Sequence, residues 1–192
     1  MAYLTALQLS EMGFDSIGDN VQISERASVY GAARISIGSH VRVDDFCILS
    51  AGEQGIRLGN HVHIACYVSL IGKEMISLGD YSGLSSRVSV YSSNDDYSGQ
   101  FMTGPTVPEE FTHVCHRPVT IGRHCIVGAG SVILPGVTLA EGCVVGAMSL
   151  VTKDCTPFGV YIGVPAKKFK MRSQNLLEVE KAFLAKKKIS EF

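Results

Sequence analysis

Aliphatic residues recur every six positions along most of the chain. The first run is Ile17, Ile23 and Val29. A period of six matches neither an amphipathic helix nor a simple alternating strand. It predicts short strands joined by turns, three to a coil, with the coils stacked into a triangular prism. The same period continues in Ile37, Val43 and Leu49; Leu58, Ile64 and Leu70; Leu78, Leu84 and Val90; and Ile121, Val127, Ile133, Leu139, Val145 and Val151.

The repeat predicts an all-β fold, a parallel β-helix of about six coils. We expect the coils to stack at the strand spacing of roughly 4.8 Å, with the aliphatic residues inside. A small residue stands four positions after most of these aliphatic residues and should share the interior. Four cysteines occupy this small position, so they are expected to be free thiols that fill the core. They are Cys47, Cys125, Cys143 and Cys155, whereas Cys66 and Cys115 fall outside the pattern and receive no assignment.

Ring side chains share one place in successive coils. His40, His61 and His124 each follow the first aliphatic residue of a coil by three positions, and Tyr81 holds that place in the coil between. They are expected to form a ladder of rings along one corner, because corner side chains point outward and do not converge on a metal. His63 is also expected to face outward.

Helices are predicted at both ends of a single domain that spans residues 1–192. Residues 2–13 resemble a short amphipathic helix that covers the open first coil, because an exposed coil edge invites pairing with other chains. Residues 173–188 predict a second helix, with Ser173 as N-cap and lysines gathered at its end. We divide the domain into a cap (1–16), the β-helix (17–157) and a C-terminal tail with its helix (158–192).

The repeat is interrupted once, by a long loop at residues 91–118. The fourth coil starts at Leu78 and the fifth only at Ile121. Loops of this length inside a compact domain are usually functional. The alternatives are a plain surface or oligomer-contact loop, with Asp95 and Asp96 starting it as an Asx-turn. The loop carries the densest polar chemistry of the chain: Asp95, Asp96, Glu109, Glu110, His113 and His116.

Composition and charge exclude several classes of partner. The formal net charge is -1, so the chain has no general attraction to nucleic acid or to an anionic membrane. No stretch approaches the roughly 18 apolar residues of a membrane span. The first residues contain neither a basic segment nor a sustained apolar run, so no signal peptide is expected. We therefore expect a cytoplasmic protein without membrane insertion.

The stretch PVTIGRHCIVGAGSVILPGVTLAEGCVVGAMSLVTKD, followed by IGVPAKKFK, resembles the hexapeptide-repeat acyltransferases. The similarity is closest to the galactoside and maltose O-acetyltransferases and to sugar acetyltransferases of O-antigen and capsule pathways. This resemblance implies a left-handed β-helix, a homotrimer, and acetyl-CoA as co-substrate between neighbouring prisms, with no metal. It implies transfer of an acetyl group to a hydroxyl or amine of a sugar or nucleotide-sugar, in surface polysaccharide biosynthesis.

The resemblance also implies which residues bind coenzyme A. The pantetheine arm would pass the small side chains of Ala129 and Ala147, and Thr152 and Lys153 would lie near the nucleotide. A cation pairs well with phosphate. Exposed surface charge is the alternative interpretation of the lysines. At the end that holds the adenine and the 3′-phosphate, the matching residues are Pro165, Lys167 and Lys170.

The catalytic base is left open, because Asp95 stands where the family has a histidine. Asp95 or Asp96 would replace it, although an aspartate with an ordinary pKa near 4 is a poor base for a hydroxyl. His116, or His113 as a weaker candidate, would otherwise supply the base from the loop. In the third hypothesis the acceptor is an amine, for which a carboxylate suffices. No residue is arranged as a covalent nucleophile.

Two other functions were weighed. A metal enzyme similar to the γ-class carbonic anhydrases needs three converging histidines, and His61 and His63 have no third partner in the sequence. A non-catalytic trimeric binding protein would have no use for a nucleotide-tail site such as Lys153 and the PAKKFK segment.

Overall fold

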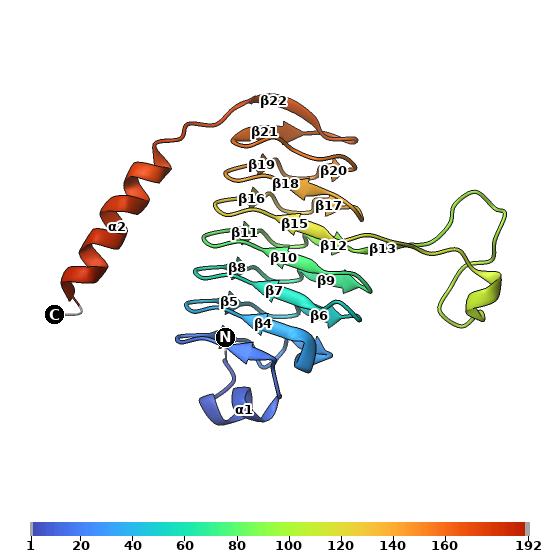
Figure 1. The fold of residues 1–192 in the computed structure, drawn as a ribbon, viewed down its shortest axis with the longest axis horizontal. Helices are drawn as coiled ribbons and strands as arrows, with labels where there is room; N and C mark the ends of the chain where they lie inside the picture. The colour runs from blue at the N-terminus through green and yellow to red at the C-terminus, as the bar shows by residue number, and fades with distance from the viewer. Residues whose placement is uncertain (1, 191–192) are drawn as a thin grey trace.

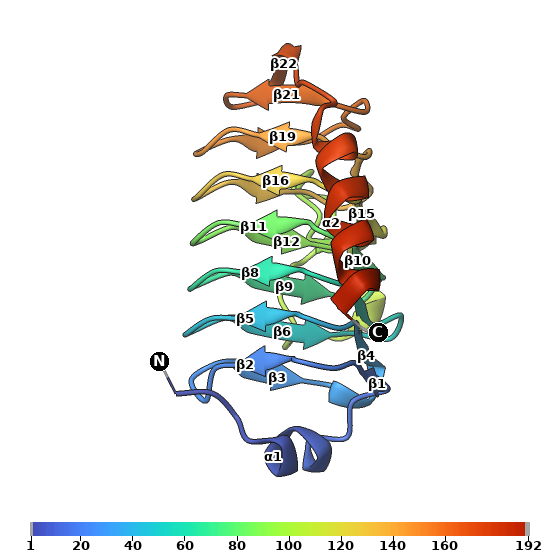
Figure 2. The same cartoon turned by 90° about the vertical axis from the view of Figure 1, so that its left-hand side faces the viewer.

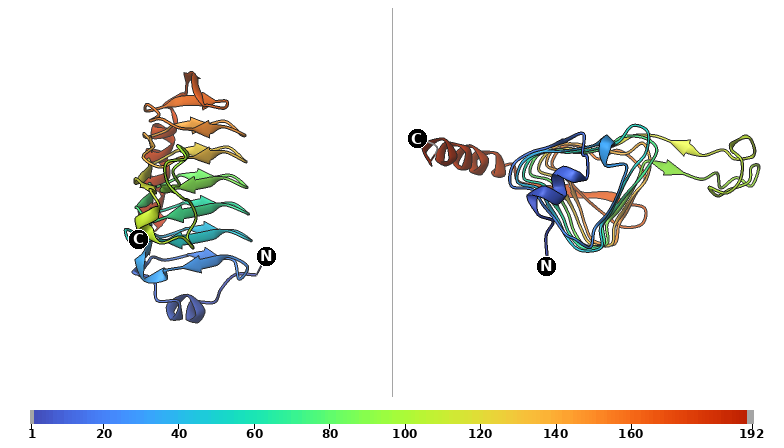
Figure 3. Two further views of the ribbon diagram at one scale, coloured as in Figure 1. Left: turned by 90° about the vertical axis from the view of Figure 1, so that its right-hand side faces the viewer. Right: turned by 90° about the horizontal axis from the view of Figure 1, so that it is seen from below.

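The computed structural model describes residues 2–190 of the chain, with side chains as far as Lys186. It is a parallel β-helix with a triangular cross-section, which confirms the predicted fold (Figure 1; Figure 3). Three sheets form its faces, and almost all strand pairs are parallel. Six coils are complete, and β21 begins a seventh.

The three faces are named here in chain order. Face 1 contains β1 (Ser16–Ile17), β4 (Ile35–Ile37), β7 (Ile56–Leu58), β10 (Ile76–Leu78), β15 (Val119–Ile121) and β18 (Thr138–Leu139). Face 2 contains β2 (Gln22–Ile23), β5 (Arg42–Val43), β8 (His63–Ile64), β11 (Gly83–Leu84), β16 (Ile126–Val127), β19 (Val144–Val145), β21 (Gly159–Ile162) and β22 (Lys167–Met171). Face 3 contains β3 (Ser28–Tyr30), β6 (Ile48–Ala51), β9 (Ser69–Gly72), β12 (Ser89–Tyr91), β17 (Val132–Ile133) and β20 (Leu150–Val151).

The turns between faces form three corners. Corner 1 follows the strands of face 1, corner 2 follows face 2 and corner 3 follows face 3. A short 3-10 helix (Ala32–Arg34) occupies corner 3 in the first coil. Equivalent residues stack from coil to coil, as in the register that pairs Leu58 with Leu78 and Leu78 with Ile121. Each position of the six-residue repeat therefore makes a vertical row along the prism.

The interior is filled as the repeat predicts. The aliphatic residues of the rows are buried except in the first coil, where Ile17 is exposed and Val29 is half-buried. The four predicted core cysteines are buried free thiols. Burial raises the pKa of the Cys47 and Cys125 thiols to about 11, so both remain protonated at neutral pH. Serines at the same small position satisfy their hydroxyls locally: Ser82 donates to the carbonyl of Gly79, and Ser131 donates to that of Gly146.

Corner 1 carries the predicted ladder of rings. His40 stacks on His61 at 4.5 Å between ring centroids, and Tyr81 stacks on both His61 and His124 at 5.0 Å. All four have positive φ angles between 56° and 60°. A left-handed backbone is unfavourable for a residue with a side chain. Stacking along the ladder is a compensating interaction that the sequence repeat provides in these four coils.

The N-terminal helix lies below the first coil (Figure 2). Helix α1 (Ala6–Glu11) is shorter than the predicted range, because a capping box fixes its start: Thr5 accepts from the backbone of Gln8, and the Gln8 side chain accepts from the backbone of Thr5. Leu9 is buried against the core. The helix therefore covers the open end of the prism.

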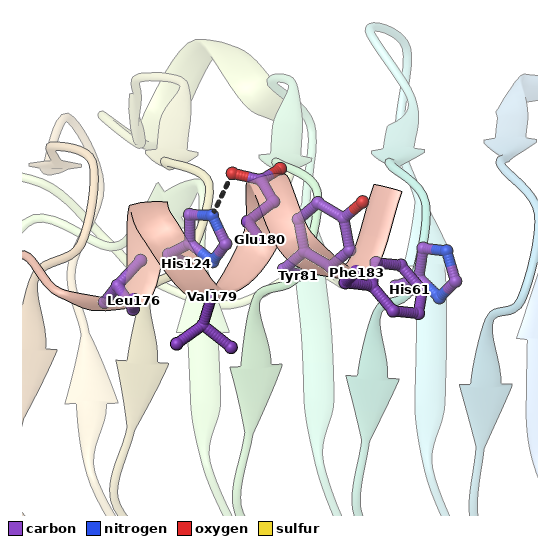
Figure 4. Close-up of a pocket in the computed structure, with 7 residues that line it drawn as sticks. All are labelled: His61, Tyr81, His124, Leu176, Val179, Glu180 and Phe183. Carbon is purple, nitrogen blue, oxygen red and sulfur yellow. Dashed lines mark hydrogen bonds and ion pairs between the residues drawn. The ribbon is translucent and has the colours of Figure 1, made fainter. Parts of the chain in front are cut away.

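The C-terminal helix α2 (Leu176–Ser190) stands beside corner 1 (Figure 1). Ser173 accepts a hydrogen bond from the backbone of Asn175, so it shapes the turn before the helix and is not at the N-cap. Glu180 binds both Arg123 and His124, and Phe183 packs edge-on against the ladder (Figure 4). The side chains of Lys187 and Lys188, and residues 191–192, lie outside the described part.

The interruption at residues 91–118 is an arm that projects from corner 3 (Figure 3). Its root is an antiparallel pair of short strands, β13 (Ser93–Asn94) and β14 (Cys115–His116), and a 3-10 helix (Glu109–Phe111) lies farther out. The arm was expected to be a loop, and the strand pair was not predicted. Among the described residues, no helix is both long and apolar enough to cross a membrane.

Candidate active site

The root of the arm is a small hydrogen-bonded unit. Ser93 and His116 are partners in the strand pair, and their Oγ and Nδ1 atoms lie 2.7 Å apart. The backbone N–H of Lys73, in the coil below, also donates to Ser93 Oγ at 2.9 Å. The arm is thus tied to the prism through the same hydroxyl that orients the imidazole.

This arrangement sets a condition on His116 as a base. A hydroxyl oxygen accepts two hydrogen bonds, so Ser93 Oγ can accept from both Lys73 N–H and a protonated Nδ1. In that tautomer Nε2 of His116 keeps its lone pair and is able to accept a proton. In the other tautomer Ser93 donates to Nδ1, Nε2 carries the hydrogen, and the ring is a donor.

The paired aspartates have different surroundings. Asp96 accepts from both the backbone N–H and the hydroxyl of Ser98, at 3.1 and 2.6 Å, which is the Asx-turn weighed for this stretch. The exposed carboxylate of Asp95 has no hydrogen-bond or ion-pair partner within the described chain. Asp95 directly follows Asn94, whose strand partner is the neighbour of His116. Asp95 is therefore the aspartate whose carboxylate oxygens can still accept a hydrogen bond or a proton from a substrate.

The outer part of the arm contains His113 and several acids. The His113 ring stacks on Phe101 at 4.9 Å, two residues before β14. Glu109 lies 4.0 Å from the Lys73 ammonium, which also pairs with Glu53 at 3.1 Å. These exposed pairs contribute little to stability.

The residues expected to bind the pantetheine arm lie at corner 2. Ala129 and Ala147 are exposed and occupy the same row in successive coils, where the backbone N–H of Met148 donates to the carbonyl of Ala129. A Cβ on Gly128 would collide with the backbone of Ala147, so the glycine lets the two coils approach. The result is a narrow, side-chain-poor strip of backbone on the outside of the prism.

The remaining coenzyme candidates are exposed at the top of the prism. Thr152 and Lys153 follow β20, and Pro165 precedes β22. Lys167 and Lys170 lie on β22, with the Lys170 ammonium 5.9 Å from the Phe169 ring centroid. Thr152 and Lys153 lie at corner 3 of the coil that contains Ala147, whereas Pro165, Lys167 and Lys170 belong to the segment above that coil.

The base candidates and the strip for the pantetheine arm are at different corners of one chain. Asp95 and His116 leave corner 3 with the arm, whereas Ala129 and Ala147 belong to corner 2. The arm points away from the prism, so it does not fold back over corner 2 (Figure 3). One chain does not bring the two groups together.

The histidines proposed for a metal enzyme are engaged elsewhere. His61 lies within the ring ladder, and His63 Nε2 bonds to Asp44 Oδ2 at 2.9 Å. Over residues 2–190, no group of three or more His, Cys, Asp or Glu side chains is placed to hold a metal ion.

Two features of the site were missed from the sequence. Ser93 gave no signal, since nothing in a polar loop indicates which residue faces a histidine. Asp44 is an acid in a row of small corner residues that includes Ala65 and Gly128. That departure from the repeat was a signal that we did not use.

Comparisons with known proteins identify the family of the chain. The family "Bacterial transferase hexapeptide (six repeats)" matches residues 118–153. The dTDP-4-amino-4,6-dideoxy-D-glucose acyltransferase of Escherichia coli is 53% identical over 183 residues, which cover 95% of each chain. A structure of AntD, an N-acyltransferase from Bacillus cereus in complex with dTDP and coenzyme A, superposes with a TM-score of 0.94 at 41% identity, covering 97% of this chain and 100% of that one.

A more distant relative is the galactoside O-acetyltransferase of Escherichia coli K12. It is 26% identical over 149 residues, which cover 76% of this chain and 68% of the relative. The chain belongs to the hexapeptide-repeat transferases, and it is an acyltransferase with the left-handed parallel β-helix of that family.

Proposed function

We propose that this protein transfers an acyl group from acyl-CoA to the amine of a nucleotide-linked amino sugar. The observation that carries the proposal is the exposed, unpartnered Asp95 carboxylate at the place where the family's histidine was expected. The full-length similarity to an acyltransferase named for a dTDP-linked amino sugar supports the same choice. The resemblance to the O-acetyltransferases, taken by itself, slightly favours a hydroxyl acceptor.

The chemistry of an amine suits a carboxylate. The neutral nitrogen attacks the thioester carbonyl carbon and forms the new C–N bond, and the C–S bond then breaks. The nitrogen loses one proton, which we assign to Asp95, and the departing sulfur ends as a thiol after taking one. A neutral amine is already nucleophilic, so the base need not be strong. Positioning of the two substrates then supplies most of the rate.

The solved relatives contain a pattern that supports Asp95. Variants of AntD were crystallised with substitutions at a serine and at an aspartate ten positions later. In this chain the same separation joins Ser85 to Asp95, and Ser86 to Asp96. Because Asp96 is already engaged by Ser98, we assign Ser85 and Asp95 to the reaction site.

The acyl donor is assigned to corner 2 and the top of the prism. The strip at Ala129 and Ala147 suits a pantetheine arm, since no side chain blocks it. Lys153, Lys167 and Lys170 offer cations to the nucleotide phosphates. The donor carries an acetyl group or a larger one, because AntD has been crystallised with 3-hydroxybutyryl-CoA.

We propose a homotrimer in which the arm of one copy completes the site on the next. The base candidates and the coenzyme strip lie at different corners of the same chain, so a second copy is needed to unite them. We place the reaction in the cytoplasm, on the way to surface polysaccharide, because nucleotide-linked sugars are activated glycosyl donors.

O-acylation is the second candidate, favoured by the pair of Ser93 and His116. A histidine held by a hydroxyl is a reasonable base for an alcohol. N-acylation should depend on Asp95, whereas O-acylation should depend on His116.

The rate at which free coenzyme A thiol is released distinguishes N-acylation from O-acylation. Wild type, Asp95→Asn and His116→Ala would be compared with acetyl-CoA against dTDP-linked amino sugars and matched hydroxy sugars. We expect thiol release with the amino sugars, a loss of about 100-fold or more in kcat for Asp95→Asn, and a smaller effect of His116→Ala. Preference for hydroxy sugars together with loss only in His116→Ala would contradict N-acylation and support the second candidate.

A further inference from the structure

A groove on face 2 lies directly below the coenzyme strip. It has a volume of about 370 Å³ and is lined by His63, Ala65, Gly83, Leu84, Ser85, Ser86 and Ile126. The carbonyl of Ser86 accepts from the backbone N–H of Gly130, next to Ala129, at 3.0 Å. The groove is therefore continuous with the strip, one coil lower.

A buried acid stands behind this groove. Asp44 is 4% exposed and is the only buried residue with an acidic or basic side chain in the described part of the chain. Its two oxygens are both engaged: Arg42 Nε donates to Oδ1 at 2.7 Å, and His63 Nε2 lies 2.9 Å from Oδ2. The two partners compensate for the burial of this carboxylate, because an unpaired buried charge is costly.

The pair of Asp44 and His63 selects one tautomer of the neutral imidazole. Burial tends to raise the pKa of the Asp44 carboxyl, but the hydrogen bonds and charges of Arg42 and His63 outweigh it, and the net pKa is lowered. An ionised carboxylate only accepts, so Nε2 of His63 must carry the hydrogen. Nδ1 of the neutral ring is then an acceptor. The side chain is 52% exposed, so it is open to a ligand.

We propose that His63, held by Asp44, binds the acceptor sugar in this groove through its Nδ1. The inference rests on the proposed function and names the acceptor end of the same site. An imidazole acceptor and two serine hydroxyls on a groove with small neighbours suit the hydroxyl and amine donors of a sugar. Ser85, assigned above by its spacing from Asp95, lines the same groove. Asp44 acts through His63 as a positioning residue.

The alternative occupant, the acyl donor, does not fit as well. The small exposed residues and the lysines assigned to coenzyme A lie in the coils above the groove. Ile126, from the coil above, forms an apolar part of the groove wall. The order along the prism is then acceptor on the lower coils and donor on the upper ones.

Steady-state kinetics with full-length protein tests the proposal. For His63→Leu we expect the KM of the dTDP-linked amino sugar to rise about tenfold, the factor of one lost hydrogen bond, with the KM of acetyl-CoA unchanged and kcat altered less than about threefold. His63→Gln keeps a donor for Asp44 and an acceptor for the ligand, so it should recover part of the affinity. Asp44→Asn should also raise the acceptor KM, because the amide can reverse the tautomer of His63.

Controls separate this proposal from the proposed function. Arg57→Gln on face 1 is an exposed change outside the groove and should leave both KM values unchanged. Equilibrium binding of the amino sugar to folded His63→Leu checks the KM result directly. Three results for His63→Leu would overturn the inference: an unchanged acceptor KM, an equal rise in both KM values, or a fall in kcat alone. In each case wild-type turnover with the amino sugar would still support N-acylation. If the wild type turns over none of the amines, the proposed function is overturned. The inference is then tested separately by binding, and it is overturned if His63→Leu binds the sugar as tightly as the wild type.

Discussion

Single residues at the arm and groove decide which chemistry the prism performs. Asp95 keeps an open carboxylate, Asp96 is used in a turn, and His116 is bound by Ser93. The sequence placed Asp95 at the expected position of the base, but it could not separate Asp95 from Asp96. The two aspartates differ because Ser98 donates hydrogen bonds to Asp96 and not to Asp95. From the sequence pattern alone, either aspartate could form that turn.

Asp44 makes the stability of the protein sensitive to acid. The pKa of its carboxyl is lowered in the folded state, so its stabilising contribution is present above the unfolded value near 4 and is lost as pH falls through the folded value. We expect Asp44→Asn to lower the melting temperature at pH 7, and the difference from wild type to shrink below about pH 4. Thermal unfolding between pH 3 and 7 measures this. A difference that stays constant over that range would show that the charge of Asp44 does not stabilise the fold.

At the scale of elements, the coils depend on close backbone stacking at the turns. A Cβ on Gly38 would lie 2.7 Å from the carbonyl carbon of Gly59 in the next coil. Backbone atoms in a stacked turn cannot move aside as a flexible side chain can, so overpacking should be costly.

Gly38→Ala is therefore expected to lower the free energy of unfolding by about 1–3 kcal/mol. Gly83→Ala is the matched control, because its Cβ would meet no atom closer than 3.9 Å. Chemical denaturation of both variants supplies the comparison. Equal stability of the two would mean that the coils have more freedom at corner 1 than the stacked geometry implies.

Elements with a strong repeat could be predicted and those without one could not. The six-residue period placed the three faces, the inward cysteines and the ring ladder of His40, His61, Tyr81 and His124, because each is repeated in several coils. The strands at the root of the arm have only two residues each and no alternation of polar and apolar positions. Their pairing depends on where the prism holds the two ends of the arm, which the local sequence does not encode.

The whole molecule presents its site in two halves. The arm extends from corner 3 (Figure 3). The strip proposed for the coenzyme lies at corner 2, and the His63 groove lies on face 2. The proposed homotrimer predicts a particle of three 20.6 kDa chains, which light scattering after size-exclusion chromatography would measure. Replacing the outer arm, residues 97–113, by a short glycine-serine linker should weaken or abolish the trimer. A stable trimer without the outer arm would place the contacts elsewhere.

Subunit complementation tests the central claim, acyl transfer at a site shared between copies, most directly. Asp95→Asn removes the base of the arm, and Ala129→Trp blocks the coenzyme strip, so each variant alone should be inactive. When the two are co-expressed with different tags, about one quarter of the sites in randomly mixed trimers pair an intact arm with an intact strip. The account predicts recovery of about that fraction of wild-type thiol release with a dTDP-linked amino sugar. Mixed trimers that form, but remain as inactive as the single variants, would contradict it.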